Sequence, residues 1–434
     1  MPFKVLIVGG AGGMGRWCAG VFNNAGFDVC ISSRRSSPEL EDLARAMSVC
    51  LVRPEDARDF DIVVLSVPMP VVEEMAALVG PRMKAGALLM DLSSLKKAPV
   101  EAMLGHTPAS VEVIGTHPLF GPGSDGRGRA VVLVPTERSS KWLPILRDIL
   151  SDAGLSVTMA TAEEHDRRVG ITQALTHYMY IAWGRAMERL GVDLKVNDDY
   201  GTPVYEITRE LAGRVLSNDP ELYTLIQTSS GAGEARRAYL EACAELSGYI
   251  ESGDLEHFEK TFETVAAFYG DTEGAKKRSG RILEKVMEDR LFVLDSVGSE
   301  RAFQVAKASN AVYGIVREAG RHDFVLETPE GALTLRYEDV MPMDDAGLRD
   351  LKMRTGSPIG RDIQVKMPIG ANPAVLQWAL GRIDGVLCVD SMTRDALGPE
   401  YVLYKFTIEV QADHSEETLQ RVLTTIWGLG LEVK

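Results

Sequence analysis

A glycine-rich turn directly after the first apolar strand constrains the fold more than any other feature of this sequence. Residues 4–15 read KVLIVGGAGGMG, and the helix-like stretch RWCAGVFNNAG follows. The turn has the spacing Gly-x-Gly-x-x-Gly at Gly10, Gly12 and Gly15. A strand, a glycine turn and a helix in this order are typical of a dinucleotide-binding βαβ unit. We therefore expect the chain to begin with a Rossmann-type, doubly wound α/β sheet, the alternative being a glycine turn without a ligand.

Each glycine of this turn has an expected role. Gly10 permits the tight turn, Gly12 lets the backbone approach a pyrophosphate, and Gly15 lets the helix pack closely on the sheet. The N-terminus of the helix then offers free N–H groups and a partial positive charge to the diphosphate. We expect the whole turn, including Gly13 and Met14, to bind the cofactor.

The end of the second strand predicts which nucleotide is preferred. NAD-selective sites place an acidic residue there to bind the ribose 2′-hydroxyl. Here the strand VCIS leads instead into Ser33, Arg34 and Arg35. Because a guanidinium pairs well with a phosphate, we predict NADP as the preferred cofactor, with NAD also accepted. The alternative is that both arginines are solvated loop charges.

Hydrophobic periodicity divides the chain into four parts. Short apolar strands alternate with helical segments over 1–158, the dinucleotide-binding domain. A capping box at Thr161 opens an all-helical substrate and dimerisation domain over 159–290. A β-rich connecting segment follows over 291–360, where FVLETPEGALTLRYED predicts a hairpin. Residues 361–434 show the order strand, helix, strand, strand, helix, strand, which predicts an α+β ferredoxin-like domain.

Composition excludes several kinds of partner. A formal net charge of −15 argues against nucleic acid and anionic membranes. No apolar run is long enough for a membrane span or a signal peptide. The odd number of cysteines lacks metal-ligand spacing, so we expect free thiols, no metal site and a cytoplasmic location. The cysteines are Cys18, Cys30, Cys50, Cys243 and Cys388.

Five further segments occur in an order and at spacings that resemble prephenate dehydrogenases. They are VVLSVPMPVVEEM, LMDLSSLKKAPVEAML, GTHPLFGPGS, EEHDRRVGITQALTHY and GRVLSNDPELY. The resemblance covers residues 4–285 and implies a dinucleotide domain followed by a helical domain that forms a homodimer. It also implies an oxidoreductase of tyrosine biosynthesis that converts prephenate to 4-hydroxyphenylpyruvate by oxidative decarboxylation, with hydride transfer to NAD(P)+. Ser66 and Pro68, in the SVP element, are expected to contact the cofactor. Because the first strand begins at residue 4, we expect no chorismate mutase segment before it.

The resemblance assigns the chemistry to two residues. His117, in HPLFGP, is expected to act as the base for the ring hydroxyl, and an ordinary histidine pKa of about 6.5 suits that role. Its position after the strand VEVIG supports this independently, because ligands bind at the carboxyl ends of strands in such sheets. Ser94, at the end of LLMDLSS, is expected to hydrogen-bond the same hydroxyl and His117. The alternatives are a loop-stabilising histidine and a serine that caps the next helix.

Recognition of a substrate carboxylate calls for a fixed cation, which favours arginine. Arg214, in GRVLSNDPELY, matches the family arginine that holds the side-chain carboxylate. Arg209 competes for this role, and a surface ion pair is the alternative. Lys96 is expected to help bind the anion, unless it is a solvated lysine. Tyr223 corresponds to an aromatic residue near the substrate, although core packing explains it nearly as well.

Two histidines of the helical domain also match the family. His165 and His177 are twelve residues apart, so a straight helix places them about 120° apart around its axis. We assign His177 to the substrate pocket and expect His165 to orient the start of the helix or to support the site from behind. Glu206 stands where an arginine is expected in the enterobacterial type, which leaves the details of substrate or inhibitor contacts open.

The C-terminal unit resembles an ACT-type regulatory domain, with GANPAVL as the loop that opens its first helix. Such domains bind amino acids, so tyrosine is an expected effector, and a packing or dimerisation module is the alternative. Other functions remain open: an arogenate dehydrogenase, a 3-hydroxyacid dehydrogenase of the 6-phosphogluconate type, and a catalytically silent NADP sensor. A 3-hydroxyacid dehydrogenase would have a lysine at the start of the helical domain, and this sequence has none there. The Ser94, His117, His177 and Arg214 set argues against the third.

Overall fold

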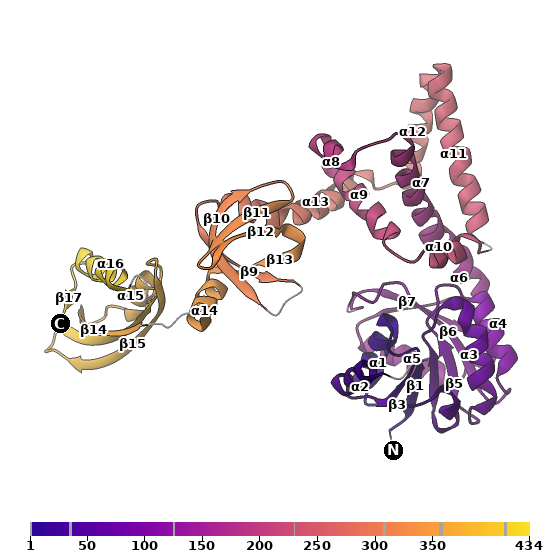
Figure 1. Ribbon diagram of the computed structural model, residues 1–434, viewed down its shortest axis with the longest axis horizontal. Coiled ribbons are helices and arrows are strands. Elements are labelled where there is room, and N and C mark those ends of the chain that lie inside the picture. Colours follow the sequence, from indigo (N-terminus) through magenta and orange to yellow (C-terminus); the bar gives the residue numbers. More distant parts are fainter. Residues whose placement is uncertain are drawn as a thin grey trace. The chain divides into compact units, whose positions relative to one another are not determined.

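The computed structural model folds into two compact units, residues 1–270 and residues 271–434 (Figure 1). It describes residues 2–33, 37–124, 126–229, 231–306, 310–355, 359–411 and 415–434. Within these ranges, no helix combines the length and the apolar character that a membrane span requires.

An eight-stranded sheet forms the core of the first unit, in the order β3-β2-β1-β4-β5-β6-β7-β8. Its strands are β1 Lys4–Val8, β2 Asp28–Ser32, β3 Cys50–Leu51, β4 Ile62–Leu65, β5 Leu88–Asp91, β6 Glu112–Pro118, β7 Ala130–Pro135 and β8 Ser156–Met159. Its helices are α1 Gly13–Asn24, α2 Pro38–Met47, α3 Val72–Val79, α4 Lys97–His106 and α5 Trp142–Asp152. Buried residues of α1, α2 and α5 pack on one face and those of α3 and α4 on the other. The central strands β4, β5 and β6 are therefore buried along their whole length.

The far side of the sheet departs from a purely parallel arrangement. Strand β7 runs antiparallel to β6 and then parallel to β8. Strand β6 also extends further than the sequence VEVIG indicates, because His117 pairs with Val132 and Pro118 with Val131. His117 thus lies within the last residues of a strand that has a partner on each side.

Helices alone form the rest of the first unit. They are α6 Ala162–Val169, α7 Thr176–Arg189, α8 Leu194–Asn197, α9 Pro203–Leu216, α10 Pro220–Gln227, α11 Ala232–Ser252 and α12 Leu255–Tyr269. Thr161 caps α6 as predicted, because its hydroxyl accepts a hydrogen bond from the backbone N–H of Glu164 at 3.1 Å. A π-helical segment, Gly170–Leu175, joins α6 to α7. A Cβ at Gly170 would lie 2.5 Å from the backbone of Gly231, so a larger residue there would push α11 away.

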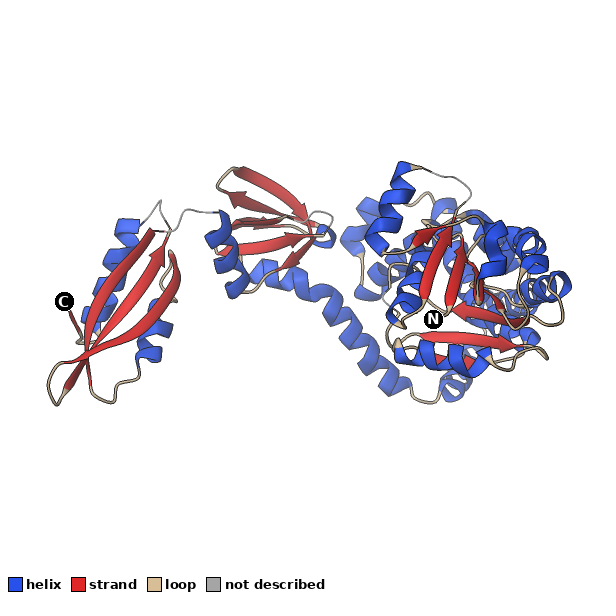
Figure 2. Ribbon diagram, turned by 90° about the horizontal axis from the view of Figure 1, so that it is seen from below, coloured by secondary structure: helices blue, strands red, loops and turns tan. Residues whose placement is uncertain are grey.

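The second unit contains two antiparallel sheets (Figure 2). The first has the order β12-β11-β10-β9-β13, and the predicted hairpin is its β11–β12 pair. The second has the order β15-β16-β14-β17, which matches the predicted ferredoxin-like arrangement. The elements are α13 Thr272–Asp295, β9 Glu300–Val305, β10 Ala311–Ala319, β11 Asp323–Thr328, β12 Gly331–Arg336, β13 Val340–Pro342, α14 Asp345–Thr355, β14 Ile359–Pro368, α15 Pro373–Leu380, β15 Val386–Ala396, β16 Tyr401–Val410, α16 Ser415–Gly428 and β17 Glu432–Val433.

The expectation that all cysteines are free is wrong for one pair. Cys30 and Cys50 form a disulfide between β2 and β3. The parallel register places these two residues opposite each other, with their Cα atoms 4.4 Å apart. Cys18, Cys243 and Cys388 are free thiols.

Candidate functional site

Four neighbouring parallel strands end at one edge of the large sheet. Strands β1, β4, β5 and β6 are adjacent and parallel, so the loops at their carboxyl ends meet at this edge. These loops carry, in order, the glycine turn, Ser66 to Pro68, Ser93 to Lys96, and the segment that follows His117. Ligands of open α/β sheets bind at such an edge.

The glycine turn has the geometry of a diphosphate site, with one correction to its expected roles. The tight turn requires Gly9, whose φ is +81° and where a Cβ would collide with the carbonyl oxygen of Ser66. Gly10 has an ordinary φ and is needed because a Cβ there would lie 2.5 Å from Ile31. Gly12 is less crowded than Gly9 and Gly10, since the nearest described atom to a Cβ at this position is the Gly9 oxygen at 3.3 Å. The contact between Gly12 and a diphosphate stays a prediction.

The helix behind the turn completes this site. Helix α1 begins at Gly13, and a Cβ at Gly15 would lie only 2.6 Å from the Gly9 oxygen, so close packing at Gly15 is confirmed. Gly12 has no side chain with which to cap α1, and the first turn contains no acidic residue. A Cβ at Gly13 would collide with Pro122, which belongs to the loop after β6. The glycine turn thus fits a dinucleotide, and the loop that follows His117 packs directly against it.

The other predicted cofactor residues lie around this edge. Ser33 and Pro68 are exposed, whereas Met14 and Ser66 are half-buried. Arg34 and Arg35, on which the predicted preference for NADP depends, lie outside the described residues. The structure therefore leaves that preference as a prediction.

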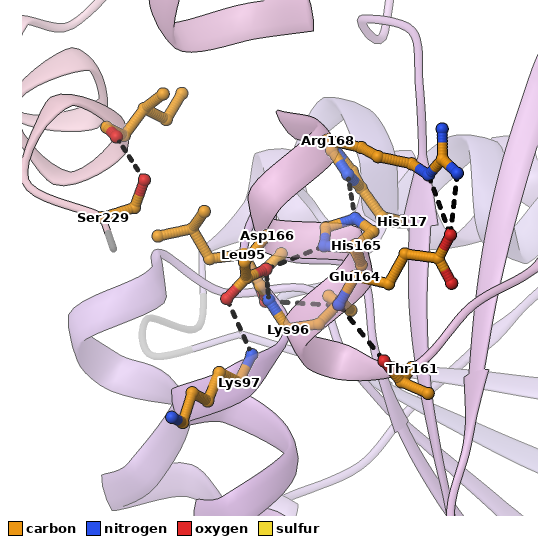
Figure 3. A network of polar contacts seen from close by, with 12 residues as sticks. Leu95, Lys96, Lys97, His117, Thr161, Glu164, His165, Asp166, Arg168 and Ser229 are labelled. Carbon is orange, nitrogen blue, oxygen red and sulfur yellow. Dashed lines mark hydrogen bonds and ion pairs between the residues drawn. The ribbon is translucent and has the colours of Figure 1, made fainter. Parts of the chain in front are cut away.

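His117 begins a chain of buried hydrogen bonds that connects the sheet to the helical domain (Figure 3). Its Nδ1 lies 2.9 Å from Nε2 of His165, and Nδ1 of His165 lies 2.8 Å from Oδ1 of Asp166. His117, His165 and Asp166 are 4%, 2% and 4% exposed. A contact network this deep is shielded from water, so each hydrogen bond must be satisfied within the protein.

For a neutral His165, these contacts allow one arrangement of the protons. The Asp166 carboxylate accepts, so Nδ1 of His165 donates and Nε2 of neutral His165 accepts. Nδ1 of His117 must then donate, which leaves Nε2 of His117 without a proton. Of the two ring nitrogens of His117, only Nδ1 has a hydrogen-bond partner among the described residues, so Nε2 is free for a ligand.

Asp166 also caps a helix of the other domain. Its two carboxylate oxygens accept hydrogen bonds from the backbone N–H groups of Lys96, at 2.7 Å, and Lys97, at 3.1 Å. These are the first N–H groups of α4, which starts at Lys97. A single carboxylate from α6 thereby orients His165 and stabilises the N-terminus of α4.

Lys96 is placed differently from the expectation for a substrate-binding residue. Its side chain is fully buried, and its ammonium forms an ion pair with Asp91 and donates to the Thr116 carbonyl at 2.8 Å. Asp91 in turn accepts from the backbone N–H of Thr116 at 3.2 Å. The pair therefore ties the end of β5 to β6, next to His117.

Burial and charge set the protonation of this cluster. Burial lowers the pKa of His117 well below 6.5, and the neighbouring Lys96 and His165 lower it further. Complete burial also lowers the pKa of Lys96, an effect that Asp91 opposes. Burial raises the pKa of Asp166, but hydrogen bonds from His165 and from two backbone N–H groups outweigh it and hold the pKa below its usual value. The arrangement favours a neutral His117 and an ionised Asp166.

Ser94 is half-buried in the loop between β5 and α4. It does not cap α4, because Lys96 occupies the N-cap position and Asp166 supplies the capping oxygens. The neighbouring Ser93, not Ser94, bonds the Asp91 carboxylate through its hydroxyl. The helix-cap alternative for Ser94 is therefore wrong.

A cavity of about 600 Å³ lies in the helical domain. Tyr223 lines it, and the ring of His177 packs edge-on against Tyr223 with centroids 4.8 Å apart. Nδ1 of His177 is buried without a hydrogen-bond partner in the described part of the chain, and burial lowers the pKa of His177. Burial raises the pKa of Tyr223, and the hydrogen bond with Asn218 and the charge of Arg214 oppose this shift. Of the predicted substrate residues, Tyr223 thus lines this cavity and His177 packs against Tyr223.

The backbone beside the cavity packs against α6. Ser229 and Gly233 line the cavity, and Gly231 lies between them. A Cβ at Gly231 would lie 2.8 Å from the carbonyl oxygen of Asp166, so this backbone packs directly on α6. The π-helical segment continues from α6 towards His177 and changes the angular relation that a straight helix would impose.

Sequence reasoning missed Asp166 and Asp91 as parts of the site and gave His165 only a general supporting role. The signal for Asp166 was present, because the acid is adjacent to the histidine in EEHDRR. The signal for Asp91 was weaker, since a buried carboxylate needs a partner and Lys96 is five residues away. Direct contact between His165 and His117 required the tertiary structure, because 48 residues separate them.

Known proteins resemble this chain over the same two domains. The curated relatives include a probable arogenate/prephenate dehydrogenase of Methanocaldococcus jannaschii, 33% identical over 272 residues, which are 61% of this chain and 61% of the relative. The T-protein of Enterobacter agglomerans is 29% identical over 62% of this chain and 68% of its own length. The match thus spans less than two thirds of the first relative.

Solved structures show the same fold. The prephenate dehydrogenase of A. aeolicus, in complex with hydroxyphenyl propionate and NAD+, is 22% identical with a TM-score of 0.52 and covers 62% of this chain and 97% of that one. The arogenate dehydrogenase of Synechocystis is 21% identical with a TM-score of 0.52 and covers 64% of this chain and 99% of that one.

Two family models match adjacent segments that together exceed half of the chain. The nucleotide-binding domain of prephenate dehydrogenase matches residues 18–159. The dimerization domain of prephenate dehydrogenase matches residues 161–264. These segments contain His117 and its two partners in one and the same contact network. The chain therefore belongs to the prephenate dehydrogenase family.

Proposed function

We propose that this protein is an NAD(P)-dependent prephenate dehydrogenase. It would convert prephenate and NAD(P)+ to 4-hydroxyphenylpyruvate, CO2 and NAD(P)H. The observation that supports the proposal is the run of contacts from His117 through His165 to Asp166, which leaves Nε2 of His117 for a ligand at the sheet edge that also carries the glycine turn.

His117 acts as the base for the ring hydroxyl of the substrate. As the hydroxyl carbon is oxidised, its proton passes to Nε2, while Nδ1 keeps its hydrogen bond to His165. The nicotinamide supplies the hydride acceptor when it is bound. Loss of CO2 leaves an aromatic ring, which provides the driving force. General-base catalysis of this kind is typically worth about 10²–10⁴ in rate, and Ser94 adds a hydrogen bond to the same hydroxyl.

The helical domain holds the substrate side chain. Arg214 provides the cation for the carboxylate, and a hydrogen bond to a charged group is worth about 1.5–3 kcal/mol. The unpartnered Nδ1 of His177 offers a further hydrogen bond, and Tyr223 provides an aromatic wall. Lys96 supports the site from behind through Asp91 and Thr116.

Turnover of prephenate, followed at 340 nm with both nucleotides, tests the proposal. We expect activity in the wild type and a fall of about 10²–10⁴-fold in His117→Asn. Absence of any turnover by a folded wild type with either nucleotide would refute it. Nucleotide preference is tested by Arg34→Ala, which should raise the KM for NADP more than that for NAD.

Arogenate is the second candidate substrate, because a curated relative carries both substrates in its name. Arogenate has an ammonium in addition to the side-chain carboxylate. Parallel assays with the two substrates decide between them. A kcat/KM at least about tenfold higher for arogenate, which is a free-energy difference of about 1.4 kcal/mol, would make arogenate the substrate.

The protein is proposed to be a homodimer with tyrosine as its effector. Large apolar side chains of the helical domain are exposed in the single chain, among them Phe262, Phe268 and Tyr269 at 69%, 89% and 71%. A second copy would cover them. Deletion of residues after 360 tests whether tyrosine inhibition depends on the ferredoxin-like domain.

A further inference from the structure

The second unit contains a polar cavity of about 570 Å³ that the proposed reaction does not use. Its walls come from the α13–β9 turn and β9, from α14, and from the turn between α15 and β15. Cavities that bind small molecules have volumes of roughly 300–1,000 Å³. The size and the mixed origin of the walls suit a ligand held at the junction of the five-stranded sheet and the ferredoxin-like domain.

Three arginine side chains line this cavity. Arg301 and Arg349 are half-buried, and Arg382 lines the cavity beside them. Within the described ranges, none of these guanidinium groups has a carboxylate at ion-pair distance. Arg301 donates to the Ser296 hydroxyl at 2.9 Å, and Arg349 donates to the Gly381 carbonyl at 3.3 Å. Neutral acceptors thus position both groups and leave their charges uncompensated.

The remaining charges do not cancel these arginines. Lys352, which is 6% exposed, forms an ion pair with Glu300, so this pair is neutral. Asp345 and Asp384 also line the cavity, but both are exposed and screened by water. Asp384 has its own cation, since its carboxylate lies 4.0 Å from Arg421.

We propose that this junction binds a small oxyanion, a carboxylate or a phosphate, through Arg301 and Arg349. The planar guanidinium fork matches the paired oxygens of either group. Such a site is notable in a chain with a net charge of −15, where cations are outnumbered. A ligand at this place contacts both domains of the second unit and would stabilise their junction.

An adjoining cavity indicates what else the ligand could carry. This space of about 280 Å³ shares Arg349 and Arg382 with the first and reaches Trp378. The guanidinium of Arg382 lies 4.7 Å from the centre of the Trp378 ring, and Trp378 is 63% exposed. An aromatic ring attached to the carboxylate therefore has a surface on which to pack.

Calorimetric titration of the full chain at low salt tests the proposal, with L-tyrosine as the carboxylate probe and inorganic phosphate as the other. We expect at least one probe to bind and to lose about 10- to 100-fold in affinity in Arg349→Gln and in Arg301→Gln. Whichever probe binds identifies the source of the oxyanion.

Arg354→Gln is the matched control, because Arg354 lies on the same helix, is exposed and pairs with Asp350 at 2.6 Å. It should bind like the wild type. Circular dichroism and melting curves establish that each variant is folded, and Arg301 provides a second variant on a different element from Arg349. The proposal fails if neither probe binds, or if both cavity variants bind as tightly as the Arg354→Gln control.

Discussion

Replacing Asp166 by asparagine should disable the proposed base without moving it. With its NH2 group in the place of Oδ1, the asparagine would donate to Nδ1 of His165 and lose the hydrogen bond from the Lys96 N–H, so Nε2 of His165 would carry the proton and donate to Nδ1 of His117. Nε2 of His117 would then be protonated and unable to accept from the substrate. The chain of contacts at 2.9 Å and 2.8 Å would persist with every donor and acceptor reversed.

The expected magnitudes follow from these contacts. We expect kcat to fall about 10²–10⁴-fold, the usual worth of a general base. The KM for the nucleotide should not change, because the glycine turn does not contact Asp166. Asp166 also accepts two backbone N–H groups of α4, and weakening one charge-assisted bond should cost about 1.5–3 kcal/mol of stability.

Steady-state kinetics at 340 nm and chemical denaturation measure both effects. Glu163→Gln is the control, since Glu163 lies exposed on the same helix. Adding Asp166→Asn to His117→Asn should not lower kcat further, because both changes remove the same function. A folded Asp166→Asn variant whose kcat stays within about threefold of the wild type would refute the reasoning on the proton positions.

Three further predictions concern the same edge of the sheet. Because the pKa of His117 is lowered, kcat/KM should fall only below pH 6.5, as pH-dependent kinetics will show. The unfolded chain gains a proton at His117 near pH 6.5 and the native chain does not. The free energy of unfolding should therefore also fall as the pH drops from 6.5 to the native pKa, which denaturation at several pH values will show. Lys96→Met leaves Asp91 buried without its cation and should cost about 3–5 kcal/mol in urea denaturation, so unchanged stability would contradict the buried pair. Gly12→Ala should fold normally but bind nucleotide weakly in fluorescence titration, whereas Gly15→Ala should lower the melting temperature; the reverse pattern would contradict the assigned roles.

Local patterns predicted much of the fold. The glycine turn, the capping Thr161 and the hairpin at β11–β12 involve residues close in sequence, so short-range geometry determines them. Hydrophobic periodicity along the sequence also predicted the ferredoxin-like order, because that order depends on which segments are strands. Gly9 shows the limit even here: a positive φ depends on the backbone path after β1, which the spacing of the motif does not reveal.

The site residues divide in the same way. His117, His177 and Tyr223 were predicted from motifs that resemble the family, and the structure brings the rings of His177 and Tyr223 into contact. Lys96 was expected to help bind an anion, with a solvated lysine as the alternative, whereas its ammonium is fully buried against Asp91. Whether a charge faces water or a buried partner is a property of packing.

The sequence by itself determined which groups are present: an imidazole at a strand end, an acid next to a second imidazole, and glycines where a phosphate approaches. Only the tertiary structure decided that Asp166, 49 residues after His117, sets the position of its proton through His165. A hydrogen bond depends on distances of about 3 Å and on which atom donates. Residues far apart in the chain meet that condition only when helix α6 packs against the end of the sheet.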